Sequence, residues 1–294
     1  LFVKEIRNEM TVKCGQKCTA VRRIMVPEQH IDVFQEQLIS QLSKVVIGDP
    51  SLEGVRMGAL VGQTQREDVR AQIAILQEES EIVFGSTDVV DVRGADSEKG
   101  AFMSPILMRV QNTNAAKKVH EVEAFGPVST IMPYSTVAEA VDLSKKGRGS
   151  LCCSIATHDR AVATEFVRNA ASMHGRILVI DRESAKESTG HGSPLPLLVH
   201  GGPGRAGGGE EMGGLRGIRH YMQRTAIQGH PSMLTAITEQ YQPGSVQPES
   251  DPHVFRKHFE ELNVGDTVTT AKHTVTEADI TNFANVSGDN FYAH

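Results

Sequence analysis

The sequence predicts an α/β fold in which helices flank a largely parallel sheet. Short β-rich runs alternate with helical patterns from Val21 to Ile180, which is typical of parallel strands joined by helical crossovers. The chain has 294 residues, of which 39% are hydrophobic, so it can bury the core of one large domain or of two unequal ones. After Asp181 the composition shifts to glycine, proline and histidine, which indicates that a long loop ends the alternation.

The predicted elements follow one another in order along the chain. Residues 21–26 predict a strand, and the pattern of residues 27–46 predicts the helix after it. Further strands are expected at 81–84 and 106–110, with a turn-rich stretch between them. The series then continues with a strand at 128–134, a helix at 136–146, a strand at 150–157, a helix at 159–172 and a strand at 176–180. Asp159 is expected to cap its helix.

The rest of the chain suggests where domains begin and end. Residues 190–217 hold too many glycines for a regular element, and their spacing fits neither a Walker loop nor a dinucleotide fingerprint. Residues 220–229 are compatible with a strand, whereas 231–252 are polar and contain proline, as a linker does. We therefore expect a domain over 1–230, a linker over 231–252 and the start of a second domain over 253–294.

Composition argues against several classes of protein. The net charge of -6 disfavours a general nucleic-acid binder, because phosphate contact requires a basic face. No run approaches the roughly 18 apolar residues of a membrane span, and no signal peptide is visible, so we expect a cytoplasmic protein without membrane partners. The four cysteines lack the paired spacing of a zinc site, so no metal is expected and a reducing compartment fits.

A thiol follows a glycine turn in the segment Cys14-Gly-Gln-Lys-Cys18-Thr-Ala. A cysteine is a good nucleophile at neutral pH, and cationic neighbours increase its thiolate fraction; here they are Lys13, Lys17, Arg22 and Arg23. Composition alone does not choose between Cys14 and Cys18. The pattern Gly-Gln-x-Cys-Thr-Ala resembles the active-site motif of the aldehyde dehydrogenase superfamily, and this resemblance implies that Cys18 attacks an aldehyde carbonyl and forms a thiohemiacetal.

A second motif, Glu123-Ala-Phe-Gly-Pro, precedes a predicted strand. It resembles the Glu-x-Phe-Gly-Pro motif of the same family, which implies that Glu123 binds the nicotinamide-ribose hydroxyls and that Phe125 packs near the nicotinamide. A carboxylate can accept two hydroxyl hydrogen bonds at once. The alternative is an exposed turn glutamate beside a core phenylalanine. Smaller similarities occur in family order at Gly48-Asp-Pro, Met57-Gly-Ala-Leu-Val and Gly149-Ser-Leu.

The resemblance covers the catalytic half of an aldehyde dehydrogenase. It implies that the cofactor-binding half and the general-base glutamate lie upstream, and we expect this chain to be an internal fragment. The resemblance implies NADP as the cofactor. NAD remains the alternative, because the strand end that discriminates the ribose 2′ position belongs to the upstream half. The resemblance also implies a homo-oligomer.

The end of the chain carries a third pattern. A Val-Gly-Asp turn is followed by a helix with Glu277 in a capping-box position, and then by Asp289-x4-His294. This order resembles the MaoC-like hot-dog hydratases, in which the Asp and His position water against an enoyl thioester. The resemblance implies the truncated start of a hot-dog α+β domain, with Asp289 and His294 as a catalytic acid/base pair. Phe291-Tyr292 departs from the usual Asn-Pro.

Together the two resemblances imply a CoA-thioester substrate. Two alternatives remain: a plain aldehyde dehydrogenase for a small free aldehyde, and a non-catalytic CoA-thioester-binding or assembly module. Histidines in or beside the glycine-rich region are expected as exposed loop residues near a substrate channel rather than as a metal cluster; they are His191, His200, His220 and His230. Arginines suit phosphate geometry, so CoA phosphates are a hypothesis for Arg205, Arg216 and Arg219.

Overall fold

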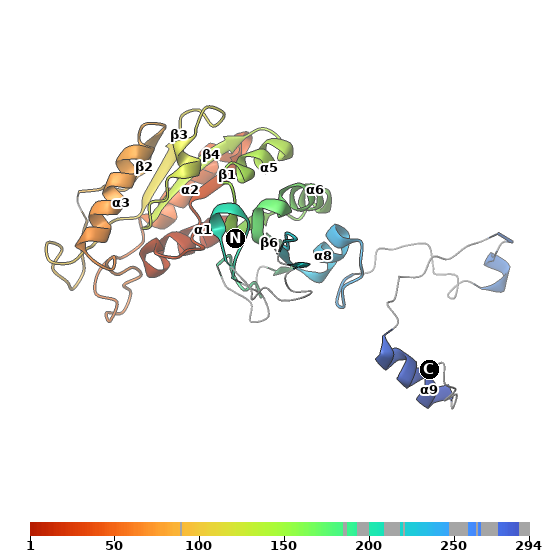
Figure 1. The fold of residues 1–294 in the computed structure, drawn as a ribbon. Helices are drawn as coiled ribbons and strands as arrows, with labels where there is room; N and C mark the ends of the chain where they lie inside the picture. Colours follow the sequence, from red (N-terminus) through yellow and green to blue (C-terminus); the bar gives the residue numbers. More distant parts are fainter. Residues whose placement is uncertain are drawn as a thin grey trace.

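The structure is a computed structural model, and two β-sheets organise its ordered elements (Figure 1). It describes residues 1–88, 90–184, 187–192, 200–208, 218–219, 221–246, 258–262, 264–265 and 276–287. The sequence predicted one sheet. The described residues form two, of four and three strands, because the strand at 150–156 pairs with the later strand at 174–180 and not with the earlier ones.

The four-stranded sheet has the order β1-β4-β3-β2. Three of its strands are parallel: β1 (Arg23–Pro27), β4 (Val128–Tyr134) and β3 (Ile106–Val110). The fourth, β2 (Ser80–Phe84), runs antiparallel to β3. A parallel connection needs a crossover, usually a helix, and the described part of the connection over 85–105 contains none. The sheet is therefore mixed.

Helices cover both faces of this sheet, as the sequence predicted. Helices α1 (Phe2–Thr11) and α2 (Ile31–Leu42) pack with one set of alternating strand residues, namely Ile24, Val26, Leu107 and Ile131. Helix α3 (Gln63–Leu76) packs with the opposite set, namely Ile106, Met108, Val128 and Met132. Successive side chains of a strand point to opposite faces, so the two cores follow from the strand sequences. The short helix α4 (Lys118–Glu121) leads into the segment that carries Glu123.

The three-stranded sheet is parallel throughout, with the order β5-β6-β7. Its strands are β5 (Ser150–Ala156), β6 (His174–Ile180) and β7 (Ala226–Gln228), and the helices before and after β5 are α5 (Val137–Lys145) and α6 (Arg160–Ala170). The predicted Asp159 cap is confirmed, because its side chain accepts hydrogen bonds from the amides of Ala161 at 2.8 Å and Val162 at 3.3 Å.

Within the predicted linker over 231–252 the structure has helix α8 (Pro231–Thr238), which the sequence pattern did not predict. Proline is tolerated in the first turn of a helix, where its missing N–H is not needed. Met233 and Ile237, one helical turn apart, pack into the core between α6 and the second sheet. The apolar pair thus outweighs the polar composition. The domain boundary itself stays a prediction.

In the C-terminal region the structure describes helix α9 (Glu277–Ser287). Thr276 and Asp279 form its capping box, whereas the sequence pattern predicts Glu277 in that position; the Glu277 side chain lies outside the described residues. The Thr276 hydroxyl accepts from the Asp279 amide at 3.2 Å, and the Asp279 carboxylate accepts from the Thr276 amide at 2.8 Å. Asp289 and His294 lie outside the described residues. Among those that are described, no helix is both long enough and apolar enough to cross a membrane.

Candidate active site

The loop between α1 and β1 carries Cys18, and its backbone turns sharply. Lys13, Cys14 and Gly15 have φ values of 53°, 54° and 66°, a conformation that favours glycine. At Gly15 a side chain has no room, because a Cβ atom would lie 2.2 Å from the carbonyl oxygen of Gly126. The loop over 15–19, which we call the nucleophile loop, therefore packs directly against the Gly126-Pro127 turn. The two motifs that resembled one family thus lie in contact.

Arg22 joins these two motifs. Its guanidinium donates to the carbonyl of Gly126 at 2.7 Å and to that of Gly15 at 2.8 Å. The same group lies 3.7 Å from a carboxylate oxygen of Glu123 and 5.3 Å from the centroid of the Phe125 ring. Burial lowers the pKa of Arg22, and Glu123 opposes this shift; arginine stays charged in any case. Glu123 and Phe125 are therefore held beside the nucleophile loop by a residue whose linking role the sequence analysis missed.

Three of the four cations expected around the thiol, namely Lys17, Arg22 and Arg23, have other partners. Lys17 lies 2.8 and 2.9 Å from the two carboxylate oxygens of Glu9, which is buried. Arg23 donates to the carbonyls of Leu143 and Ser144. The prediction that neighbouring cations activate Cys18 is thus weakened, because a paired cation offers little field to a third group.

The four cysteines differ in exposure, and all of them lie in the described part of the chain. Cys18 is exposed, Cys14 is buried, and Cys152 and Cys153 are half-buried. Burial raises the pKa of the thiols of Cys14 and Cys153 to about 12 and also raises that of Cys152. Since the thiolate is the reactive form, these values favour Cys18 over Cys14 as the nucleophile. The Cys18 sulfur lies 3.3 Å from Nε2 of His200.

His191 precedes Gly192, which contacts the nucleophile loop. It is buried, so the prediction that this histidine is exposed was wrong. Its Nδ1 is 2.6 Å from the Ser154 hydroxyl of β5, and burial lowers its pKa to about 4. The adjacent Gly192 carbonyl accepts from the Thr19 hydroxyl at 3.4 Å. The segment at 190–192 thus supports the nucleophile loop from the second sheet.

The remaining basic and metal-ligating candidates are reported where the structure describes them. His200 is exposed, as expected, and the ring of His230 accepts from the Ser232 amide at 3.3 Å. Arg205 donates to the carbonyls of His120 and Glu121, so its guanidinium already has partners. Arg219 is exposed, whereas His220 and Arg216 lie outside the described residues. No group of three or more potential metal ligands occurs among the described residues.

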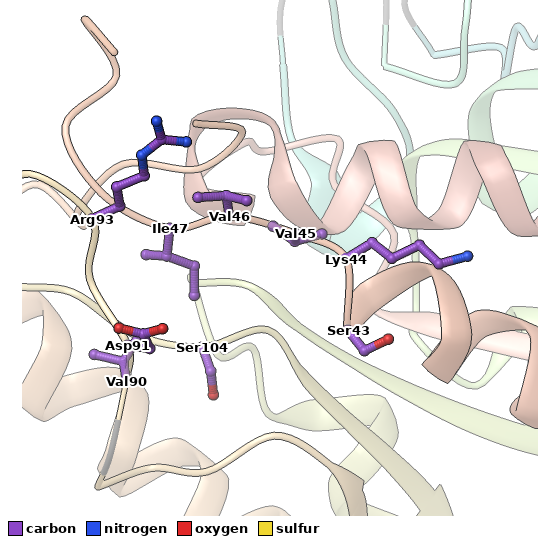
Figure 2. A pocket seen from close by; sticks show the side chains of 9 residues that line it. All are labelled: Ser43, Lys44, Val45, Val46, Ile47, Val90, Asp91, Arg93 and Ser104. Carbon is purple, nitrogen blue, oxygen red and sulfur yellow. The ribbon is translucent and has the colours of Figure 1, made fainter. Parts of the chain in front are cut away.

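Two cavities have linings that do not include Cys18. Figure 2 shows one of about 420 Å³ between the segment that follows α2 and the segment around Asp91. The other, of about 520 Å³, is lined by Lys13, Cys14 and Gln16 of the turn before Cys18. None of the described site candidates Cys18, Glu123 and Phe125 lines either cavity. We therefore place the candidate active site at the exposed Cys18 sulfur and not in these cavities.

Comparison with known proteins agrees with this geometry. Residues 1–227 match the model of the aldehyde dehydrogenase family, and the chain belongs to that family. The chain is 49% identical over 239 residues to a Klebsiella aerogenes protein called protein MaoC, a match that covers 81% of this chain and 70% of that relative. It is also 41% identical over 203 residues to 3,4-dehydroadipyl-CoA semialdehyde dehydrogenase of Aromatoleum evansii, covering 69% of this chain and 39% of that one.

Solved structures show the same fold. A point mutant of betaine aldehyde dehydrogenase from Staphylococcus aureus, in complex with NAD+, superposes with a TM-score of 0.59 at 24% identity. The match covers 72% of this chain and 40% of that one. The chain thus spans about two fifths of the length of two of these relatives.

Proposed function

We propose that this chain provides the catalytic half of a dehydrogenase that oxidises an aldehyde carried on a CoA thioester to the carboxylic acid, with Cys18 as its nucleophile. The observation that carries the proposal is the contact between the nucleophile loop and the Glu123 motif, bridged by Arg22. A reacting thiol and a ribose-binding carboxylate must lie close together for such an oxidation. The relative named a CoA semialdehyde dehydrogenase supports the substrate class.

The reaction begins when the Cys18 sulfur attacks the aldehyde carbon and forms a thiohemiacetal. The oxygen of this adduct carries negative charge as it forms, and a backbone amide is a suitable donor for it. Among the described residues the Cys18 amide donates to no acceptor, so it is free for this role. Such a donor contributes about 3 kcal/mol to transition-state stability. Loss of hydride gives a thioester on Cys18, which water then hydrolyses.

The residues present fit a nicotinamide cofactor. The Glu123 side chain is 48% exposed, and its one described partner is the Arg22 guanidinium at 3.7 Å, so its oxygens can accept the two ribose hydroxyls. Phe125 is held against Arg22 beside it. The bound cofactor supplies the hydride acceptor. We propose NADP, with NAD as the alternative; the similar Staphylococcus aureus structure holds NAD+.

We further propose that the natural protein is bifunctional, acting in the cytoplasm as a homo-oligomer in phenylacetate catabolism. Asp289 and His294 would belong to a MaoC-like domain that hydrolyses the ring of oxepin-CoA, and the Cys18 site would oxidise the semialdehyde that ring opening releases. The relative named protein MaoC supports this pairing. Short transit between two sites suits a reactive aldehyde.

The dehydrogenase proposal is tested by NADP reduction with an aldehyde-bearing CoA thioester, measured on the natural gene product that carries this chain. Cys18→Ser is expected to abolish turnover, and Cys152→Ser, at a half-buried thiol, to retain most of it. Equal turnover in Cys18→Ser and the parent would contradict the proposal.

The two alternatives predict different results. A plain aldehyde dehydrogenase would oxidise a small free aldehyde as well as its CoA-linked counterpart, and Asp289→Asn would leave every activity unchanged. A non-catalytic module would bind the CoA thioester and reduce no cofactor. Loss of ring hydrolysis alone in Asp289→Asn is the result that the bifunctional proposal requires.

A further inference from the structure

We propose that His200 is a catalytic residue that accepts the proton of the Cys18 thiol. Its Nε2 lies 3.3 Å from the Cys18 sulfur, within the range for a hydrogen bond to sulfur and well placed for proton transfer. The inference rests on the proposed role of Cys18 as nucleophile. It supplies the activation that the paired cations Lys17 and Arg23 do not.

The backbone next to His200 is held by close packing, which gives the imidazole a defined position. The segment over 201–208, which we call the glycine loop, lies so near the second sheet that a Cβ on Gly175 of β6 would be 1.8 Å from the Gly201 oxygen. A Cβ on Gly202 would be 2.5 Å from the Ser150 oxygen of β5. At Gly175 and Gly202 only glycine allows the two backbones to approach so closely.

Hydrogen bonds also fix the glycine loop. The Gly202 amide donates to the Gly207 carbonyl at 2.8 Å, and the Arg205 amide to the Arg148 carbonyl at 3.0 Å. The Arg205 guanidinium reaches helix α4, where it donates to the His120 and Glu121 carbonyls at 3.1 and 3.0 Å. Immediately after His200 the loop is therefore anchored to β5 and β6 of the second sheet and to helix α4.

The other titratable groups around the pair are committed elsewhere. From the nucleophile loop and α1, Lys17 is paired with Glu9. From the second sheet, Cys152 accepts a hydrogen bond from Arg176 at 2.7 Å, and the pKa of its thiol is raised by burial and, to a smaller degree, by Cys18. His191 is buried and bonded to Ser154. Of the described imidazoles, His200 is the one in contact with the Cys18 sulfur.

The proton transfer balances within the two residues. The S–H bond of Cys18 breaks, the proton moves to Nε2, and an imidazolium and a thiolate result. The thiolate electron pair then forms the bond to the aldehyde carbon, and the electron pair of the carbonyl π bond moves to oxygen. No oxidant is needed for this step, because the hydride leaves later. The imidazolium stays beside the adduct and can return its proton.

The experiment measures the alkylation rate of Cys18 by iodoacetamide, followed on the Cys18 peptide by mass spectrometry at pH 7 and pH 10. Compared with the parent, His200→Gln is expected to react about tenfold more slowly at pH 7, because a free thiol is only a few per cent ionised there. At pH 10 the rates should converge, since hydroxide removes the proton without help. His158→Gln, at another exposed loop histidine, is the matched control and should not change either rate.

Equal rates in the parent and His200→Gln at pH 7 would overturn the proposal. So would a decrease of the same size at both pH values, because it would mean that His200 only shapes access to the thiol. The unsubstituted protein provides a test that does not depend on how a variant folds. Its Cys18 alkylation rate at pH 7 should exceed a tenth of its rate at pH 10. A pH 7 rate of only a few per cent of the pH 10 rate would contradict the inference. Alkylation needs no aldehyde and no cofactor, so failure of the dehydrogenase proposal appears separately, as absent turnover with a normal alkylation profile.

Discussion

Two loops meet at the Cys18 sulfur, and they are held in different ways. The nucleophile loop is fixed by side chains, since Arg22 donates to the Gly15 and Gly126 carbonyls and Lys17 pairs with buried Glu9. The glycine loop is fixed mainly by backbone contact with β5 and β6. A loop that is fixed by particular side chains can be recognised in the sequence as a motif. A loop whose glycines allow close backbone contact can be recognised only by its glycine-rich composition.

This difference separates the roles that we assign. The nucleophile loop also holds the cofactor motif, so a change there should alter stability and cofactor affinity together. The glycine loop positions one imidazole, so a change there should mainly alter the reactivity of Cys18. Four substitutions test this separation.

The largest effect is expected for Gly15→Ala. The new Cβ would lie 2.2 Å from the Gly126 oxygen, and alanine would have to adopt a φ of 66°. Strain and overpacking together should lower the free energy of unfolding by about 3 kcal/mol. Urea denaturation measures it, with Gly58→Ala as control, because a Cβ there meets its nearest neighbour at 3.7 Å. Equal midpoints for the two variants would mean that the loop does not pack on the turn as described.

Arg22→Met comes next. It removes the charged donor from two buried backbone carbonyls, which costs about 2 kcal/mol, and it releases Glu123. Unfolding in urea gives the stability, and titration with NADP on the natural gene product gives the affinity, which should fall. Arg109→Met is the control, since Arg109 pairs at 2.8 Å with exposed Asp32 and should cost less than about 1 kcal/mol. Unchanged cofactor affinity in Arg22→Met would mean that Arg22 does not position Glu123 for cofactor binding.

The third prediction concerns the pH dependence of stability that arises from His191, in the segment at 190–192 that contacts the nucleophile loop. Burial lowers the pKa of His191 from 6.5 to about 4. Between these pH values the unfolded state binds a proton at His191 and the folded state does not. Stability is therefore full above pH 6.5 and is lost as the pH falls towards 4. His120 and His174 shift in the same direction.

The variant His191→Gln removes one of these three groups. Its unfolding free energy should fall less steeply between pH 6.5 and 4, by about 1.4 kcal/mol per pH unit. Denaturation at a series of pH values measures the slope. A slope identical to that of the parent would show that His191 is protonated equally in both states.

Gly175→Ala should lower the free energy of unfolding by about 2 kcal/mol, because its Cβ would meet backbone atoms of the glycine loop and of β5, and the loop would have to be displaced. Its Cβ would lie 1.8 Å from the Gly201 oxygen. The displaced loop carries His200 with it, so alkylation of Cys18 at pH 7 should slow several-fold. A variant that is strongly destabilised and yet retains normal Cys18 reactivity would reverse the assignment of the two loops.

Much of the fold was predictable from the sequence. The strands at 106–110 and 128–134 were predicted with the bounds observed, because short runs rich in apolar and β-branched residues, bounded by turns, mark them locally. The division into two sheets and the direction of β2 were not, since strand pairing depends on contacts distant in sequence. Helix α8 was missed because Met233 and Ile237 find their buried partners only in α6 and β6, which are distant in sequence.

The candidate site divides in the same way. Cys18, Glu123 and Phe125 were nominated from short motifs, and the structure brings them together through Arg22. The arginine was noted for its charge, but nothing local indicated that it faces the second motif. The contact of His200 with Cys18 joins residues 182 positions apart, and no sequence pattern encodes such a distance.

The most direct test of the account is to trap the intermediate on the natural gene product. A single turnover with the aldehyde-bearing CoA thioester and NADP, quenched in acid at a series of early times and digested, should show the acyl group on Cys18, with the trapped thioester and the released acid together matching the NADPH formed. An acyl group on Cys14 in place of Cys18, or NADPH formation in the Cys18→Ser variant, would contradict the assignment of Cys18 as the nucleophile.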